Sequence, residues 1–521
     1  VFVALMSPSV PAQVPRAGGV LTFVVGSNLP SFDAHRESTF GVIHPIRPFY
    51  SLLIRVDPEN PQAADAFECD LCEGSVPRPD EGGTRYRFRI RRDVSFHDGT
   101  ALTAADVKVS LDKIIFPPEG VPSSRKAFFS MVESVQAPSS HELLIKLKYP
   151  SATFLPSLAL PFNFIYSARD LNEHGYDWPM RHVNGTGPFR FVQYQPGAFV
   201  EGRRYERYHF SGRPYLDGFR AVIATKTAVR LQAIRSGRAA IEFRGFSPKA
   251  RDELVEALGD RLQVQESDWN CGVYFIFNHA RPPFDDPRVR RALNLAVDRW
   301  SGSRYLSSVA IVRTPGGIVF PGHPLAANRE ELMQLEGFGP DIELSRARAR
   351  ALLAEAGQSG LSLTLTNRAV DQPYKALGGW LTDEWRQIGV TTRQLMLPTG
   401  GWYQSLRQTK DFEVATDFNC QAIINPIADV SKWLGSAGNN HANYRDEMLE
   451  SLHARLLRTP DVEEQRRLMR QFEQRAVSEM AHMGLTLWWY KINPHWAYVK
   501  GWKAGPSHYL NQHLDNVWLD R

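Results

Sequence analysis

A short apolar run in the middle of the chain marks a change from strand to helix. Residues 274–277 are all aromatic or aliphatic, as in a strand buried on both faces. The prolines at 282–283 end this strand, and one of the aspartates at 285–286 can cap a helix that has Pro287 in its first turn. Apolar residues recur at helical spacing from 289 to 297, which predicts one buried stripe. The same pattern places four arginines in solvent: Arg288, Arg290, Arg291 and Arg299.

Strands and helices are predicted on both sides of this run. Residues 19–26 and 85–96 alternate between apolar and polar positions, which is typical of half-buried strands. Thr103 and Asp106 form a capping pair in front of an apolar helical stripe. Helices and strands then alternate between residues 343 and 397, which indicates a second α/β region.

Length and composition indicate a globular chain of several domains. The 521 residues are too many for one hydrophobic core, so two or three domains are expected. With 43% hydrophobic and 22% charged residues the composition argues against disorder. The net charge of +5 is a small surplus spread along the chain, so nucleic acid is not an expected partner. No apolar run approaches the roughly 18 residues of a membrane-spanning helix.

The first residues have a different character from the rest. Residues 1–13 begin with an apolar run and continue with small residues and proline, like the second half of a secretory signal without its positive start. A disordered tail is the alternative interpretation. The folded region is expected to open at Gly18, and an export signal would place the protein outside the cytoplasm.

The sequence lacks the short motifs of several common enzyme families. It contains no GxSxG, GxxxxGK[ST], GxGxxG or HExxH. Cys69 and Cys72 form a single CxxC without a second pair or a nearby histidine, which gives poor support for structural zinc. A local disulfide and two unpaired thiols are both compatible with this spacing.

Several segments resemble one family of binding proteins. The segment FNHARPPFDDPRVRRALNLAVDR at 277–299 resembles the signature of the family 5 extracellular solute-binding proteins, the oligopeptide, dipeptide and nickel receptors of ABC importers. FHDGTALTAADV at 96–107 and NGTGPF at 184–189 resemble two further blocks of the same family. The resemblance implies a two-lobed, α/β periplasmic-binding-protein fold of type II with an extra accessory α/β domain, mixed sheets and two crossing hinge strands.

The resemblance also implies domain boundaries. We expect a signal remnant or tail at residues 1–17, an accessory domain at 49–181 and a second lobe at 273–490. The first lobe is then built from three segments, residues 18–48, 182–272 and 491–521.

Two cysteines occupy positions where enteric oligopeptide-binding relatives carry a pair. The resemblance therefore implies a disulfide between Cys271 and Cys420, which suits an oxidising compartment. Closing so long a loop contributes about 4 to 5 kcal/mol in the chain-entropy model.

The segment after Thr416 departs from the pattern of the peptide receptors. Those relatives have an aspartate two residues after the cysteine, which pairs with the ammonium of the ligand, and this chain has Ala422. Burying a peptide ammonium without a carboxylate costs several kcal/mol, unless Asp417 or Asp429 substitutes. We therefore expect a ligand other than a typical oligopeptide, such as an opine, a sugar conjugate, a modified peptide or another small polar solute.

The family holds its ligand between the lobes, so contacts are expected from segments far apart in sequence. His441 corresponds to a region where nickel receptors use a cleft histidine with a small chelator, although a lone histidine is more often a loop residue. No cofactor, metal site or catalytic residue is expected. The candidate ligand contacts are Ser27, Asn28, Arg125, Phe128, Tyr374, Trp402, Asp417, Asn419, Asp429, His441, Trp489 and Tyr490.

The function that these observations favour is a receptor and not an enzyme. The expected protein is a monomeric periplasmic receptor that captures a peptide-like or other small polar solute and delivers it to an ABC permease and its ATPase. One alternative is a periplasmic hydrolase that uses Cys271 or Cys420 as nucleophile. Another is a chaperone or sensor of the same fold without a transport role.

Overall fold

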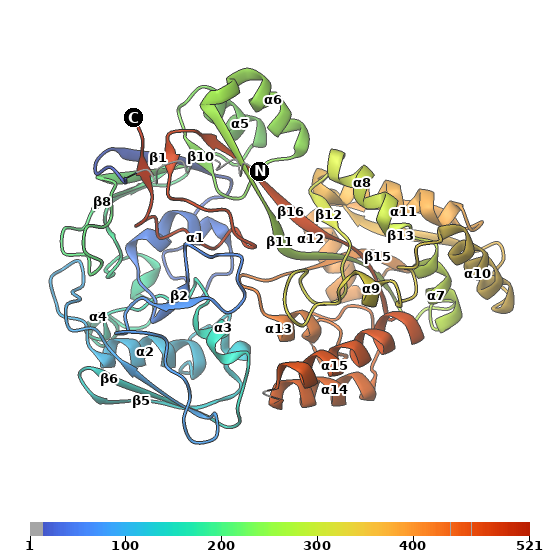
Figure 1. The fold of residues 1–521 in the computed structure, drawn as a ribbon, viewed down its shortest axis with the longest axis horizontal. Helices are drawn as coiled ribbons and strands as arrows, with labels where there is room; N and C mark the ends of the chain where they lie inside the picture. Colours follow the sequence, from blue (N-terminus) through green and yellow to red (C-terminus); the bar gives the residue numbers. More distant parts are fainter. Residues whose placement is uncertain (1–13, 438, 460) are drawn as a thin grey trace, which may run out of the picture.

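The computed structural model describes residues 14–437, 439–459 and 461–521, so the signal-like stretch 1–13 lies outside the described residues. One mixed sheet extends through two lobes (Figure 1). Its main path has the order β14-β13-β15-β11-β16-β10-β1-β9-β8-β7, and β12 pairs with β16 beside it. The long strands β11 (Leu262–Phe277) and β16 (Met483–Trp496) lie antiparallel and cross from one lobe to the other. The expected two-lobed α/β architecture with two crossing strands is confirmed.

The first lobe contains one end of this sheet. β1 (Val20–Val25) pairs in parallel with β9 and β10, and an apolar core surrounds Phe23, Phe49 and Phe219. The other elements of this part of the sheet and its helices are β7 (Phe189–Gln195), β8 (Phe199–Arg204), β9 (Gly218–Ile223), β10 (Ile241–Glu242), α1 (Phe40–Ile46), α5 (Thr227–Arg235) and α6 (Pro248–Leu258).

A separate apolar core fills the region between α1 and β7 in sequence. It packs α2 (Ala104–Ile115) on a three-stranded antiparallel sheet, and the predicted capping box of Thr103 and Asp106 is confirmed. The remaining elements here are β2 (Ile54–Val56), β3 (Phe67–Cys69), β4 (Arg85–Arg89), β5 (Val132–Ser139), β6 (Glu142–Leu147), α3 (Phe154–Leu158) and α4 (Ala168–His174). The domain boundaries proposed from the sequence stay a prediction.

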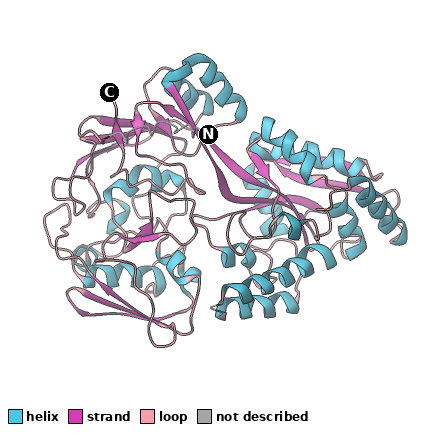
Figure 2. Cartoon of the chain, viewed as in Figure 1, coloured by secondary structure: helices cyan, strands magenta, loops and turns pink. Residues whose placement is uncertain are grey.

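The second lobe places helices on both faces of the other end of the sheet (Figure 2). Its strands are β12 (Val312–Thr314), β13 (Ser362–Arg368), β14 (Thr391–Leu397) and β15 (Val414–Cys420). Its helices are α7 (Pro287–Leu295), α8 (Arg299–Val309), α9 (Arg329–Leu332), α10 (Ile342–Glu355), α11 (Ala376–Arg386), α12 (Thr399–Tyr403), α13 (Pro426–Ser431), α14 (Glu447–Arg458) and α15 (Val462–Glu473). None of the described helices is both long and apolar enough to cross a bilayer.

Two disulfides are present. Cys271 and Cys420 face each other on β11 and β15 and are bonded, which confirms the predicted pair. Cys69 and Cys72 are also bonded, which decides between the two alternatives that their spacing left open.

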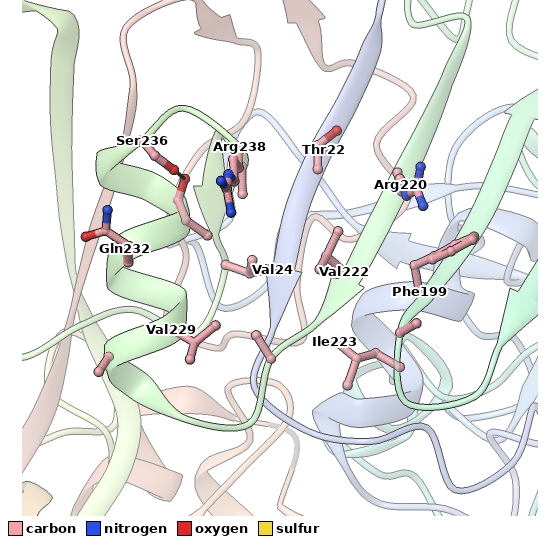
Figure 3. Close-up of a pocket in the computed structure, with 15 residues that line it drawn as sticks. Thr22, Val24, Phe199, Arg220, Val222, Ile223, Val229, Gln232, Ser236 and Arg238 are labelled. Carbon is pink, nitrogen blue, oxygen red and sulfur yellow. Dashed lines mark hydrogen bonds between the residues drawn. The ribbon is translucent and has the colours of Figure 1, made fainter.

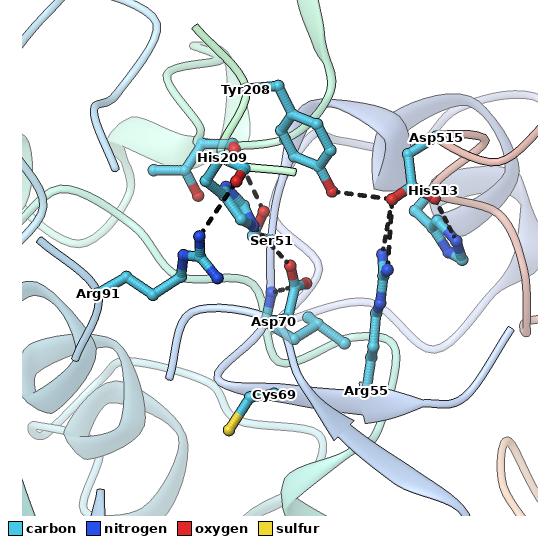
Figure 4. Close-up of polar contacts among 12 residues, drawn as sticks. Ser51, Arg55, Cys69, Asp70, Arg91, Tyr208, His209, His513 and Asp515 are labelled. Atoms are coloured by element: carbon cyan, nitrogen blue, oxygen red, sulfur yellow. Dashed lines mark hydrogen bonds and ion pairs between the residues drawn. The ribbon is translucent and has the colours of Figure 1, made fainter. Parts of the chain in front are cut away.

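The C-terminal segment is tied to the start of the chain by a buried polar network (Figure 4). Asp515 accepts hydrogen bonds from Arg55 at 3.2 and 3.3 Å and from the Tyr208 hydroxyl at 3.2 Å, and His513 Nε2 lies 2.8 Å from its other oxygen. Burial opposes ionisation of Asp515, but Arg55 and His513 outweigh that effect and hold its pKa well below the usual value. The strand pair β17 (Val499–Lys500) and β18 (Trp518–Leu519) lies on either side of this segment in sequence.

The exposure predicted for two of the four arginines after residue 287 is wrong. The helix begins as predicted, with the Asp286 carboxylate accepting from the Arg288 amide at 2.8 Å. Arg290 and Arg299, however, are buried with 1% and 0% of their surface exposed. Their guanidinium groups bind backbone carbonyls, which for Arg299 are those of Leu485, Asn294, Val297 and Gly337. The five donors of a guanidinium can thus satisfy several backbone carbonyls inside the core at once.

We expect Arg299→Met to destabilise the protein strongly. The substitution leaves several buried carbonyls without donors, at about 1 to 3 kcal/mol each, so a loss of about 3 kcal/mol or more is expected. The measurement is the urea midpoint followed by tryptophan fluorescence. Arg304→Ala is the matched control, because Arg304 is an exposed residue of the same helix, and its midpoint should stay close to that of the wild type. Equal midpoints for the two variants would contradict this role of Arg299.

Candidate ligand-binding site

Two cavities have walls that come from both lobes. The first, here called the hinge cavity, has a volume of about 410 Å³ and lies beside the crossing strands. The second, here called the outer cavity, has a volume of about 430 Å³ and lies between residues 127–157 and residues 425–457. Both volumes are within the range of small-ligand pockets.

A larger cavity of about 1010 Å³ belongs to the first lobe alone (Figure 3). Val24 of β1 and Val222 of β9 form one wall, and Val229 and Gln232 of α5 stand opposite. All of its lining residues lie between 22 and 239, so a molecule bound there touches one lobe only. Such a molecule cannot favour closure of the two lobes through contacts with both.

The hinge cavity is rich in positive charge. Its first-lobe wall includes Arg230, Arg244 and Lys491, and its second-lobe wall includes Asp371. The Arg244 side chain is exposed to the cavity and lies over the rings of Phe40, at 5.0 Å, and of Trp269, at 6.0 Å. These ring contacts position the guanidinium without neutralising it.

Lys491 is the most unusual group of this cavity. Its side chain is 1% exposed, on a strand whose neighbours Tyr490 and Ile492 are also buried. Burial lowers the pKa of Lys491 to about 7, and the charge of Glu242 only partly opposes that shift. Glu242 is itself buried, and its carboxylate accepts a hydrogen bond from the Gly245 amide at 2.6 Å.

Aromatic rings join the hinge cavity to the second lobe. Trp269 on β11 packs edge-on against Trp489 on β16, with ring centroids 5.2 Å apart, and against His508 at 4.9 Å. Trp489 in turn contacts Tyr374 of the second lobe at 6.2 Å. Burial raises the pKa of Tyr374, and Arg368, over its ring at 5.4 Å, acts in the opposite direction.

Some of the residues proposed from the sequence lie at these cavities. Tyr490 lines the hinge cavity and Phe128 the outer cavity, while Tyr374 and Trp489 belong to the aromatic contacts just described. The three consecutive aromatic residues of β16 do not share one environment, since Trp488 instead packs on Phe320.

Four other proposed residues lie in different surroundings. Trp402 is fully buried and stacks on Phe418, so it contributes to the core of the second lobe. Arg125 is buried over Phe162 at 3.9 Å and donates to the Glu37 carbonyl. Ser27 and Asn28 follow β1 and pack against the start of α1, where a side chain at Gly41 would meet the Asn28 carbonyl oxygen at 2.7 Å.

The proposed acidic residues are engaged within the protein. Asp417 pairs with buried Lys432 at 2.5 Å. Asp429 is fully buried, and burial raises its pKa well above the usual value. Asn419 lies beside Asp429, at 3.5 Å, and neither residue lines the hinge or the outer cavity. His441 is buried, and desolvation lowers its pKa to about 4.

Ala422, where the resemblance to the peptide receptors implies an aspartate, is covered by protein. Ala422 packs against apolar residues of both first-lobe cores, and Ile423 is part of one of them. The Asn270 side-chain amide donates to the Ile423 carbonyl at 2.8 Å, which holds this segment against the hinge strand. A small apolar side chain fits this contact, whereas a carboxylate would be desolvated there.

The cations of the hinge cavity were not predicted from the sequence. Lys491 follows the run LTLWWY directly, and a lysine in an otherwise apolar buried strand is a signal that the sequence did contain. Arg244 gave no such signal, because its neighbours in sequence are ordinary loop residues.

Comparison with known proteins places the chain in a family. The model of the bacterial extracellular solute-binding proteins, family 5 middle, matches residues 66–441. The chain belongs to this family. The resemblance seen in the sequence is thereby confirmed, and the relatives named below are all binding proteins.

Curated relatives and solved structures agree with this placement. The chain is 32% identical over 248 residues to a probable di/tripeptide-binding protein 5 of Pseudomonas aeruginosa, a match that spans 44% of this chain and only 46% of that protein. It is 26% identical over 480 residues to the glutathione-binding protein GsiB of Salmonella choleraesuis, covering 89% and 88% of the two chains. Among solved structures, the substrate-binding protein CtaP of Listeria monocytogenes matches with a TM-score of 0.83 at 19% identity, covering 97% of this chain and 100% of the other. AgaA of A. tumefaciens R10, solved in complex with agropinic acid, matches with a TM-score of 0.75 at 20% identity over 96% and 99%.

We expect the stability contribution of Lys491 to depend on pH. Its folded pKa of about 7 lies below the value of about 10.4 of an exposed lysine, so between these values the unfolded chain binds more protons. The free energy of unfolding of the wild type, minus that of Lys491→Met, should therefore rise from pH 7 to pH 9, by at most about 1.4 kcal/mol per pH unit. Urea titrations of both proteins at pH 7, 8 and 9 measure this, and a difference independent of pH would contradict it.

Proposed function

We propose that this protein is the extracytoplasmic receptor of an ABC importer and captures a peptide-like or other small polar solute between its lobes. In this proposal the receptor is an exported monomer that closes around the solute and then docks on a permease and its ATPase. The observation that carries the proposal is the pair of cavities whose walls come from both lobes.

The geometry supports closure by a hinge. The two lobes are joined by β11 and β16 and by the segment after β15, so they can change their angle while each core stays packed. A solute in the hinge cavity touches Arg244 on one side and Gln372 on the other. A solute that contacts both walls binds the closed state more tightly than the open state. This difference in binding free energy is the amount by which the solute favours closure.

The comparisons support a solute of the size of a short peptide. The relatives of Pseudomonas aeruginosa and Salmonella are named for di- or tripeptides and for glutathione, and one structural neighbour was solved with agropinic acid. A cavity of about 410 Å³ suits molecules of this size better than a long oligopeptide.

The cysteine-hydrolase alternative is not supported. Cys271 and Cys420 form a disulfide, and a bonded sulfur provides no thiolate nucleophile.

Closure of the two lobes should change the radius of gyration of the protein in solution. Protein freed of any bound solute by unfolding and refolding, with its disulfides intact, should have a larger radius of gyration than the same protein with a binding solute. The solute is found by native mass spectrometry of protein purified without unfolding, and small-angle X-ray scattering then compares the two states. An identical radius for the free and loaded protein would count against a closing receptor.

Thiol titration gives an independent check on the enzyme alternative. We expect no reactive thiols in the unfolded, non-reduced protein and four after reduction, because all four cysteines are bonded. A single reactive thiol in the folded protein would restore the hydrolase as a candidate.

A further inference from the structure

Buried lysines in this chain normally have a carboxylate partner. Three lysines of the described residues are buried, each with 1% of its surface exposed: Lys113, Lys432 and Lys491. Lys113 pairs with Asp33 at 2.6 Å and Lys432 pairs with Asp417 at 2.5 Å. Within the described chain the Lys491 ammonium has neither an ion pair nor a hydrogen bond. A buried charge without a partner is costly, so Lys491 stands out from the other two.

The Arg244 guanidinium is exposed to the cavity, and it too has no ion pair within the described chain. Its contacts in the described structure are the faces of Phe40 and Trp269, and no carboxylate or carbonyl binds it. Arg290 and Arg299, by contrast, use their donors on backbone carbonyls. The five donors of Arg244 are therefore free to bind a group inside the cavity.

The charges around these two groups favour an anion. The groups that act on Lys491 or line the same cavity are Glu242, Arg230, Arg244 and Asp371, and two histidines, His44 and His508, lie behind the wall. Burial lowers the pKa of both histidines, so they add no positive charge near neutral pH. Arg230 donates to the Ala224 and Thr225 carbonyls and forms no ion pair in the described chain. The first-lobe wall thus has three cations, and the acidic group that acts on Lys491, Glu242, binds a backbone amide.

We propose that the solute carries an anionic group, a carboxylate or a similar oxyanion, which Arg244 and Lys491 bind on the first-lobe side of the hinge cavity. This proposal rests on the proposed receptor function and narrows the class of its solute. A guanidinium binds a carboxylate through two parallel hydrogen bonds, and an ammonium adds a third charged donor. The ring of Trp269 lies under the Arg244 guanidinium and provides a flat apolar surface for the rest of the solute.

The binding of an anionic group by Arg244 and Lys491 also explains why this chain has Ala422 in place of an aspartate. A receptor that holds a solute by its ammonium group needs a carboxylate in the cleft, and here Ala422 is packed against the first lobe while Asp417 is occupied by Lys432. With cations in place of that carboxylate, the orientation of the solute is fixed from its negatively charged end.

The experiment uses matched pairs of solutes that differ only in charge. The full chain, freed of bound solute, is screened by thermal shift with di- and tripeptides, glutathione and glutarate, each beside its carboxamide counterpart, and binding constants follow from calorimetry. We expect the acids to bind about 10-fold or more tightly than their amides. Arg244→Gln and Lys491→Met should each remove about 10-fold of the affinity for the acid while leaving the affinity for the amide little changed.

The matched control is Arg238→Gln. Arg238 is exposed and lines the separate cavity of the first lobe, so this variant loses a positive charge from the same lobe without changing the hinge cavity. It should bind the acids as the wild type does, which separates a local contact from a change in net charge.

Proton uptake on binding is a second measurement. It would not depend on Lys491 if this residue only stabilised the fold. An anion beside Lys491 favours the charged ammonium, so binding near pH 8 should take up as much as about one proton in the wild type and none in Lys491→Met. Calorimetry in buffers of different ionisation enthalpy measures this number.

Three results would overturn the proposal: no anionic solute of the panel binds, the acid and amide forms bind equally, or both variants bind the acid like the wild type. A neutral solute that binds and contracts the protein would refute the anion assignment and leave the receptor function intact. A bound anion that produces no contraction would instead count against the receptor function.

Discussion

The backbone ladder between β11 and β16 is the constraint on which the rest of the molecule depends. It pairs Leu262 with Trp496 at one end and Ile276 with Met483 at the other, and so runs through both lobes. Backbone groups buried in such a ladder have no water to replace their partners, so the ladder resists separation. Relative movement of the lobes must then come from bending of the strands. The register shifts between Asp268 and Gly272 mark the place where the regular pairing is interrupted.

The candidate site lies at this irregular part of the ladder. Trp269 lies within the interruption and Trp489 lies opposite it on β16, while Lys491 pairs with Ser267 just before it. The residues that would sense the solute are thus close to the residues that must bend.

Much of the fold could be read from local patterns. The helix at Pro287 and the capping box at Thr103 depend on neighbours within a few residues, and both are found where they were expected. The burial of Arg299 depends on the carbonyls of Gly337 and Leu485, which lie far away in sequence. The local pattern that places arginine on the solvent face of a helix cannot predict partners so distant in sequence.

The site was harder to predict than the fold for the same reason. Family position suggested Trp402, and Asp417 was a possible substitute for the missing aspartate. In this chain Trp402 is enclosed by Phe418 and its neighbours, and Asp417 is paired with Lys432. Whether an acidic residue is free to bind a solute depends on a partner elsewhere in the fold. The uncompensated charge of Lys491 likewise becomes visible only once the carboxylates of the surrounding elements have been placed.

The buried network around Asp515 has a consequence for the order of assembly. The first lobe starts with β1 and is completed by Asp515 against Arg55 and by the pairing of β17 with β18, more than 450 residues later in the chain. The second lobe, in contrast, is assembled from one intervening stretch. A chain that emerges from a membrane pore with its N-terminus leading can therefore complete the second lobe first. The first lobe can be completed only after the C-terminal residues have emerged.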